Sequence, residues 1–230
     1  MKINAIRAFS DNYIWIIEID GEYVVVDPGE AEPVFDFLKD KAPTAILLTH
    51  KHSDHVGGVE EIVKKYGDVR VFGPNETAKY NDVSLSGGTE LELLGKVFAV
   101  IDTPGHTEEH ISYLVDDKLF CGDALFLAGC GRVFTKDYAA QYETMKKFAA
   151  LDDEVEAYPA HEYSLSNLEF TMKYRPNDAV EEEYERVKKL RDEDKNTLPT
   201  TIGKEKEINP FIRAKDLDEF VELRLAKDKF

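Results

Sequence analysis

The sequence predicts an α/β sandwich followed by a small helical domain. Over the first two-thirds of the 230-residue chain, short runs of β-branched and aromatic residues alternate with stretches whose apolar residues follow helical spacing. Strands and helices interleaved in this way favour a layered α/β fold over an all-β or an all-α fold. After His161 only helical patterns follow, so we expect one domain over residues 1–163 and a second over residues 164–230.

The predicted elements begin with a hairpin and a helix. Residues 13–19 and 23–26 have the composition of strands, and the Asp-Gly pair at 20–21 is a hairpin turn signal. Pro33 is typical of the first turn of a helix. Three apolar side chains are expected on one face of that helix: Val34, Phe37 and Leu38.

The remaining elements follow the same alternation. A continuous apolar strand over 45–49 leads directly into His50, and a helix is expected over about 56–66. Further strands are expected at 69–72, 97–102, 111–115, 118–121 and 155–158, with a helix over 138–151. The second domain is expected to hold helices over 165–174, 178–195 and 217–227, with a loop around Leu198-Pro199.

Acidic residues dominate the composition and limit the possible partners. There are 29 Lys and Arg against 46 Asp and Glu, a net charge of −17. This excludes nucleic acid and anionic membranes as general partners, because both require clustered cations. No stretch reaches the roughly 18 apolar residues of a membrane span, and residues 1–10 lack an apolar signal core. We therefore expect a cytoplasmic protein, and a monomer.

Three of the six histidines lie in one short segment that also contains an aspartate. His50 and His52 are two residues apart, so an extended strand end points both imidazoles the same way. Asp54 and His55 are expected to project from the following turn. Imidazole and carboxylate ligands suit zinc, iron or manganese, whereas calcium prefers oxygen ligands alone. The segment therefore predicts a metal site at the end of a strand.

This HxHxDH pattern resembles that of the metallo-β-lactamase superfamily, and the rest of the chain fits the resemblance. The superfamily has a further histidine, then an aspartate, then a final histidine, each after a strand. Here these residues are His106, Asp123 and His161, each placed shortly after a predicted strand. The resemblance implies an αββα sandwich.

Three longer segments are similar to the glyoxalase II family, whose members are also called hydroxyacylglutathione hydrolases. They are residues 121–132, 159–170 and 209–213, and the Asp-Asn-Tyr at 11–13 fits the same family. The third segment lies in the helical domain, so the resemblance extends almost to the end of the chain. It implies hydrolysis of S-D-lactoylglutathione to D-lactate and glutathione, the second step of methylglyoxal detoxification.

The family's pattern implies two divalent metal ions per chain, of zinc, iron or manganese. The first ion is expected on His50, His52 and His106. The second is expected on Asp54, His55 and His161. Asp123 is expected to bridge both ions together with a water or hydroxide, and Asp54 and Asp123 to be the catalytic residues around that hydroxide. Each ion then lacks a full protein shell, as catalytic sites require.

The resemblance also implies a glutathione site between the two domains. Its residues in this chain are Arg132, Phe134, Tyr163, Arg213 and Lys215. Arginine can bind the carboxylates of glutathione in a bidentate way. The chain departs from the family after Phe134, where Thr-Lys-Asp stands in place of Glu-Gly-Thr, and Phe134 lacks the hydroxyl that some members have. The identity of the thiol therefore stays open.

Other functions and roles also stay open. The chain could act on a thioester of another low-molecular-weight thiol, or be a mononuclear iron persulfide dioxygenase of the same fold. A lactonase or β-lactamase, or a structural metal module, fits less well. Asp27 is either a turn residue or an acceptor that orients a ligand imidazole, and His110 is interpreted as a supporting residue. Cys121 and Cys130 are expected to be reduced thiols packed in turns.

Overall fold

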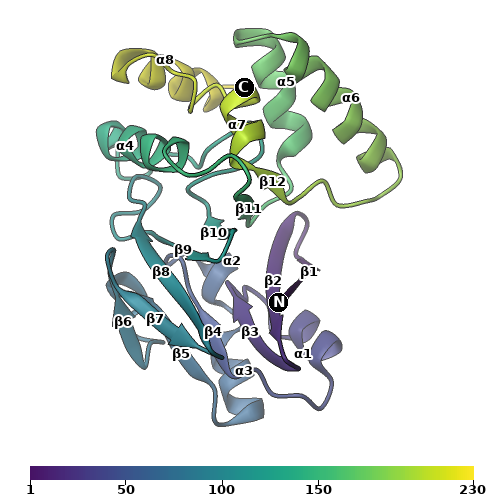
Figure 1. The fold of residues 1–230 in the computed structure, drawn as a ribbon, viewed down its shortest axis with the longest axis vertical. Coiled ribbons are helices and arrows are strands. Elements are labelled where there is room, and N and C mark those ends of the chain that lie inside the picture. The colour runs from purple at the N-terminus through teal and green to yellow at the C-terminus, as the bar shows by residue number, and fades with distance from the viewer.

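Two six-stranded sheets face each other in the computed structural model, and helices cover the outer side of each sheet (Figure 1). The structure describes residues 1–230. The order in the first sheet is β1 (Lys2–Ala8), β2 (Asn12–Ile19), β3 (Glu22–Val26), β4 (Ala45–Leu47), β5 (Arg70–Pro74) and β6 (Val83–Leu85). The order in the second sheet is β12 (Thr200–Thr201), β11 (Glu156–Pro159), β10 (Lys118–Gly122), β9 (Ile111–Val115), β8 (Lys96–Asp102) and β7 (Glu90–Leu93). The predicted αββα sandwich is confirmed.

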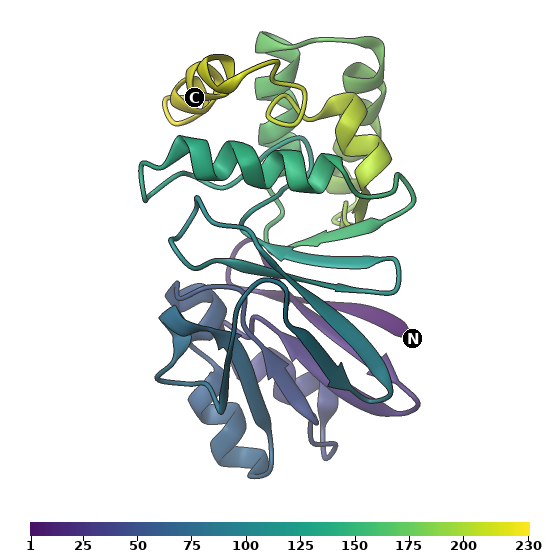
Figure 2. The ribbon, with the colours of Figure 1, turned by 60° about the vertical axis from the view of Figure 1, so that its left-hand side comes forward.

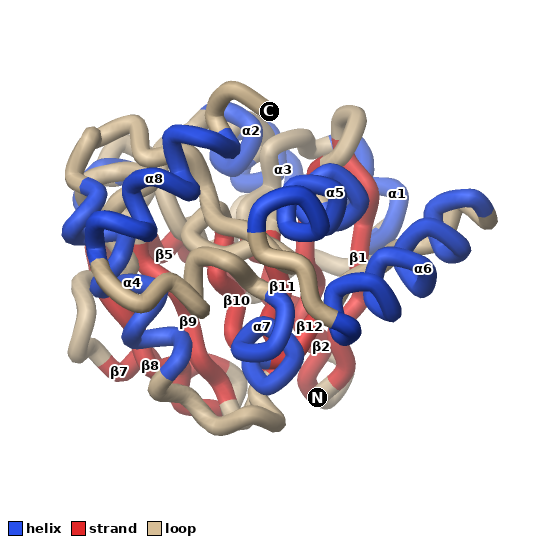
Figure 3. Tube along the Cα trace, turned by 90° about the horizontal axis from the view of Figure 1, so that it is seen from above, coloured by secondary structure: helices blue, strands red, loops and turns tan.

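The helices divide between the two outer sides of the sandwich. Outside the first sheet lie α1 (Glu32–Leu38), α2 (Ser53–Val56) and α3 (Val59–Tyr66). Outside the second sheet, α4 (Tyr138–Ala149) lies between the strands and the C-terminal helices (Figure 2). Those helices are α5 (Ser164–Tyr174), α6 (Asp178–Asp192), α7 (Ile202–Ile208) and α8 (Leu217–Lys227). Seen from above, α6 and α8 lie on opposite sides of α5 and α7 (Figure 3).

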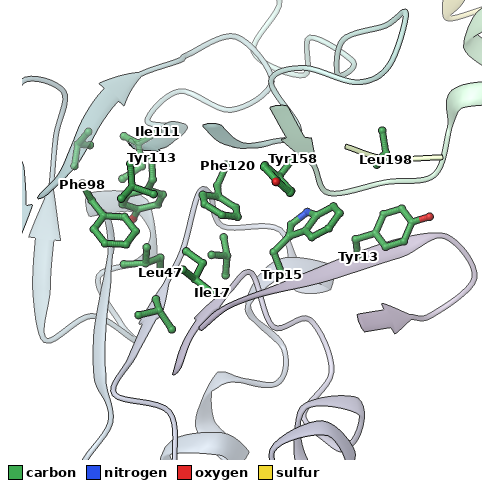
Figure 4. Close-up of a cluster of buried hydrophobic side chains, with 14 of the residues drawn as sticks. Tyr13, Trp15, Ile17, Leu47, Phe98, Ile111, Tyr113, Phe120, Tyr158 and Leu198 are labelled. Atoms are coloured by element: carbon green, nitrogen blue, oxygen red, sulfur yellow. The ribbon is translucent and has the colours of Figure 1, made fainter. Parts of the chain in front are cut away.

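Strand β2 shows how alternation sorts side chains between two cores. Tyr13, Trp15 and Ile17 belong to the core between the sheets, whereas Ile14 and Ile16 belong to the core beneath α1 and α3. Figure 4 shows the core between the sheets, where aromatic side chains of the second sheet lie opposite those of β2. Each isoleucine of β2 named here is at most 1% exposed, so its burial stabilises the fold by about 1.5–3 kcal/mol.

A third core attaches the C-terminal helices to the sandwich. Leu119 of β10 and Phe148 of α4 share it with Phe170 of α5 and Phe220 of α8. Strand β12 also pairs with β11, so the segment after residue 163 contributes to the second sheet as well as to the helices. The domain boundary at residues 163–164 stays a prediction, because this core extends across it.

The sequence does not predict several short elements: β1, β6, β7, β12 and α7. Strands at the edge of a sheet bury few side chains, and β1 buries only Ile6 and Ala8. Such strands therefore give a weak periodic signal. The prediction that Phe37 shares a face with Val34 and Leu38 is wrong in part, because Phe37 is 40% exposed while the other two are buried.

The helix expected over 56–66 is interrupted, and α2 and α3 meet at two glycines. A Cβ on Gly57 would lie 2.6 Å from the carbonyl oxygen of Gly29, and a Cβ on Gly58 would lie 2.6 Å from the backbone nitrogen of Ala31. Only glycine fits where these backbones approach each other so closely. Asp54 and His55 lie within α2, not in the expected turn. No helix is both long and apolar enough to cross a membrane.

Candidate metal centre and substrate cavity

All the predicted metal ligands lie where strands of the two sheets end. His50 and His52 follow β4, and Asp54 and His55 lie in the adjoining helix α2. From the second sheet, His106 follows β8, Asp123 follows β10 and His161 follows β11. The strand ends meet at one edge of the sandwich, so side chains more than a hundred residues apart come within contact distance there.

A first cluster contains three histidines and one carboxylate. Ligand atoms of His50, His52, His106 and Asp123 all lie within 4.8 Å of one another. Nδ1 of His52 is 3.0 Å from Nε2 of His50 and 2.9 Å from Nε2 of His106. Oδ2 of Asp123 is 3.2 Å from Nε2 of His106. Four donors therefore face one small volume, as a metal ion requires.

A second cluster lies beside the first and shares Asp123 with it. Ligand atoms of Asp54, His55 and His161 lie within 4.8 Å of one another. Oδ1 of Asp123 is 3.3 Å from Nε2 of His55 and 3.2 Å from Nε2 of His161. Asp123 therefore directs one carboxylate oxygen toward each cluster.

The residues present fit divalent metal ions. Nε2 of His55 and Oδ1 of Asp123 are buried and have no hydrogen-bond partner, which is rare for polar atoms in a folded protein. Burial lowers the pKa of His50 and His106, so both imidazoles are neutral at pH 7 and offer lone pairs. Burial also lowers the pKa of His161, but the charge of Asp123 and hydrogen bonds to Asp123 and Asp54 together outweigh this and raise it to about 10. The same negative charge that attracts a proton attracts a cation.

Carboxylates and a carbonyl accept hydrogen bonds from the ring nitrogens of three ligand histidines that face away from the clusters. Nδ1 of His55 donates to Oδ2 of Asp27 at 3.0 Å, and Nδ1 of His161 donates to Oδ1 of Asp11 at 2.8 Å. Nδ1 of His106 donates to the carbonyl of Arg132 at 2.8 Å. Such contacts fix the tautomer and the ring orientation of a ligand. Asp27 also has a φ of +51° in its turn, so both interpretations of this residue are correct.

Two further residues support the cluster without joining it. The backbone N–H of Asp123 donates to Nε2 of His110 at 3.2 Å. Sequence reasoning missed the second residue, Glu76, whose Oε1 accepts from the backbone N–H of Lys51 at 3.3 Å and from the hydroxyl of Thr107 at 2.5 Å. Glu76 therefore connects the two loops that carry the histidines of the first cluster. No local motif marks it, because its partners are distant in the sequence.

A cavity of about 560 Å³ opens over both clusters. Among the residues that line it are three cations and three aromatic side chains: Arg132, Arg224, Lys227, Phe126, Phe134 and Tyr163. Phe134 is 58% exposed, and its ring meets the rings of His52 and His106 edge-on at 5.4 and 5.3 Å. The ring of Tyr163 stacks on His161 at 4.7 Å. The structure thus brings three of the predicted substrate contacts together at the metal clusters.

The structure does not bring the other two predicted cations to this cavity. Nη1 of Arg213 donates to the carbonyl of Arg175 at 3.3 Å, and Lys215 is exposed beside Asp216. Sequence reasoning instead missed Arg224 and Lys227, which lie three residues apart at the end of α8. Basic residues are common in the last turn of a helix, so nothing in the sequence distinguished this pair.

The cavity cations are partly neutralised by one carboxylate. Oδ1 of Asp228 is 3.0 Å from Nη2 of Arg224 and 3.4 Å from Nε of Arg132. Arg224 also donates from Nη1 to the carbonyl of Cys130 at 2.7 Å. These contacts hold two guanidinium groups from distant parts of the chain beside each other.

Both cysteines are free and buried. Cys130 lines the cavity, and Cys121 lies in β10. Burial raises the pKa of both thiols, that of Cys130 to about 11. Neither is a thiolate at neutral pH, so neither is suited to act as a nucleophile.

Comparisons with known proteins cover the whole chain. A family model described as the metallo-beta-lactamase superfamily matches residues 8–161, and one described as the hydroxyacylglutathione hydrolase C-terminus matches residues 162–230. The hydroxyacylglutathione hydrolase of Glaesserella parasuis is 48% identical over 234 residues, and that of Haemophilus ducreyi is 46% identical; each alignment covers 100% of both chains. A crystal structure of ETHE1 from Myxococcus xanthus is similar with a TM-score of 0.75 and 26% identity, and the match covers 98% of this chain and 90% of that one.

Proposed function

The chain belongs to the hydroxyacylglutathione hydrolase family of the metallo-β-lactamase superfamily, and on this premise we propose how its site acts. It is a metal-dependent thioester hydrolase. The proposed substrate is S-D-lactoylglutathione, and the products are D-lactate and glutathione. One observation carries the assignment: two ligand clusters share Asp123 and open into a cavity lined by cations and aromatic rings.

Two divalent ions are proposed for the two clusters. The first would be held by His50, His52 and His106, and the second by Asp54, His55 and His161. Asp123 would hold both, because its two oxygens face different clusters. This donor set suits zinc, iron and manganese alike.

The chemistry is divided between the metal centre and the side chains around it. Divalent ions, when bound, lower the pKa of water toward 7 and polarise a carbonyl oxygen. The carboxylates of Asp54 and Asp123 line the cavity, and we assign them the role of orienting the water that attacks the thioester carbon. Asn12 donates to Oδ2 of Asp54 at 3.0 Å, which fixes the direction of that carboxylate.

Recognition of the thiol is assigned to the cavity wall. Arg132, Arg224 and Lys227 would bind the carboxylates of glutathione, which a protein with a net charge of −17 does not attract by its overall field. Phe134 and Tyr163 would flank the acyl-thiol end, where they cover the imidazoles of the ligands. Arg213 and Lys215, predicted from the sequence as further contacts, do not line this cavity, and we propose no contact with the thiol for them.

Thioester loss from S-D-lactoylglutathione tests the function directly. We expect purified, metal-loaded protein to hydrolyse it with a KM between about 1 µM and 1 mM, to lose activity on chelation and to regain it when metal is restored. Two metals per chain and equal rates with and without oxygen would exclude the persulfide dioxygenase alternative. Absence of hydrolysis by the fully loaded protein would contradict the proposal and direct the search to thioesters of other thiols. Location in the cytoplasm and a monomeric state stay predictions.

A further inference from the structure

The loop over residues 124–131 connects two parts of the proposed metal centre. It begins directly after Asp123 and ends directly before Arg132. The carbonyl of Arg132 accepts a hydrogen bond from Nδ1 of His106. Within it, the ring of Phe126 lines the cavity 5.8 Å from His161 and 5.2 Å from Tyr163. The position of the loop therefore sets the shape of the cavity wall beside both clusters.

Side chains of the C-terminal helices bind the backbone of this loop. The N–H of Ala128 donates to Oε2 of Glu205 at 2.9 Å. Nδ2 of Asn209 donates to the carbonyls of Gly129 at 2.9 Å and Phe126 at 3.3 Å. Nδ2 of Asn167 donates to the carbonyl of Leu127 at 3.0 Å. Each residue of the turn over 126–129 is thus bound by a side chain of α5, of α7 or of Asn209, which directly follows α7.

The conformation of this turn is not one that its residues prefer by themselves. Ala128 has a φ of +51°, in the left-handed region that alanine rarely adopts. A Cβ on Gly129 would collide with the side chain of Asn167. Phe126 and Gly129 close the turn through reciprocal backbone hydrogen bonds of 2.9 and 3.0 Å, and the contacts from outside the loop help to hold its strained residue in place.

Glu205 is the centre of these contacts and has no counterion. It is 0% exposed and accepts hydrogen bonds from the hydroxyl of Thr200 at 2.7 Å and from Nδ2 of Asn209 at 2.8 Å, besides that of Ala128. Burial raises its pKa to about 7, and these hydrogen bonds act in the opposite direction. A buried carboxyl without a cation stabilises a fold less than an apolar side chain of similar size. Its contribution is therefore the position of the groups that it binds.

We propose that Glu205 and Asn209 are positioning residues for substrate binding, which act by holding the turn over 126–129 against the cavity. This inference rests on the proposed function, because the cavity is the one assigned to the thioester. It assigns a role in the metal-centre wall to α7, a helix that contributes no residue to that wall itself.

Three variants test the proposal: Glu205→Ala, Glu205→Gln and Val187→Ala. In metal-loaded protein, we expect Glu205→Ala to raise KM about tenfold while kcat changes less than about threefold, because binding is lost and the ligands remain. Glu205→Gln keeps an oxygen for Ala128 and Asn209, so it should restore KM to within about twofold of the wild type. Val187 is buried in α6, and its truncation lowers the melting temperature without touching the loop, so KM should not change.

Two results would overturn the positioning role. One is an unchanged KM in folded, metal-loaded Glu205→Ala, and the other is an equal rise of KM in Val187→Ala. If Glu205→Ala does not fold, Asn209→Ala takes its place, because it leaves the carboxylate and its contact with Ala128 intact. The wild-type rate in the same assay tests the thioesterase function separately, since its absence contradicts that function and not the contacts of the loop.

Discussion

The metal-ligand edge of the sandwich and the cationic wall of the cavity are built in different ways. The ligands come from strand ends and from α2, and each lies beside a strand that is buried in a core. The cations come from the loop that ends at Arg132 and from α8, which meet only through packing of the C-terminal helices. The first region depends on strand ends that the packing of the two sheets brings together, whereas the second depends on how the C-terminal helices dock.

The largest effect is expected from breaking the bridge between the two ligand clusters. Asp123→Asn removes a negative charge that faces three histidines, and an amide offers only one oxygen as a ligand. We expect bound metal to fall from two ions per chain to one or none, and kcat/KM to fall by more than about a hundredfold. Metal analysis and thioester assays measure both. Asp116→Asn, in an exposed turn, is the matched control. Full metal content with normal turnover in Asp123→Asn would contradict the role of Asp123 as a bridge.

A smaller effect is expected in the cavity wall, where two arginines can be compared. Arg224→Ala should raise KM about tenfold and lower kcat less, because it removes binding remote from the scissile bond. Arg213→Ala should leave KM within about twofold, since Arg213 does not line the cavity. Steady-state kinetics decide between them. The reverse pattern would restore Arg213 as the substrate contact and show that the wall is built from the segment after Asn209.

The smallest effect is a dependence of KM on pH. Burial and the neighbouring Arg224 lower the pKa of Lys227 to about 8. Its charge is therefore present below pH 8 and lost as pH rises through 8, so KM for an anionic thioester should rise a few-fold between pH 7 and pH 9. Lys227→Arg keeps its charge in this range and should flatten the profile. An equal slope in both proteins would show that another group is responsible.

The ligand set could be predicted because its signal is local. His50 and His52 lie in one segment of sequence, and that segment led to the superfamily resemblance that supplied His106, Asp123 and His161, each after a recognisable strand. Asp27 and Glu76 show which supporting residues the sequence can and cannot identify. Asp27 was recognised as a candidate because it is near a turn, but Glu76 acts on two loops that are separated in sequence and gives no pattern.

The same contrast explains the errors in the fold and in the wall. A strand such as β2 can be predicted from its continuous run of β-branched and aromatic residues. β1 and β6 bury too few side chains to give a clear strand pattern in the sequence. The chain has 29 Lys and Arg residues, and most lie on exposed surfaces. Lys215 and Lys227 look alike in the sequence, and only the docking of α8 beside the loop that ends at Arg132 distinguishes them.

The two buried thiols have a consequence for the redox chemistry of the protein. Hydrolysis of a thioester releases a thiol, and the disulfides that such thiols form react with proteins through exposed thiolates. Cys130 lies at the cavity where that thiol departs, yet it is only 4% exposed and its pKa is raised to about 11. Cys121 is fully buried. Neither thiol is therefore suited to form a mixed disulfide with the oxidised form of the released thiol.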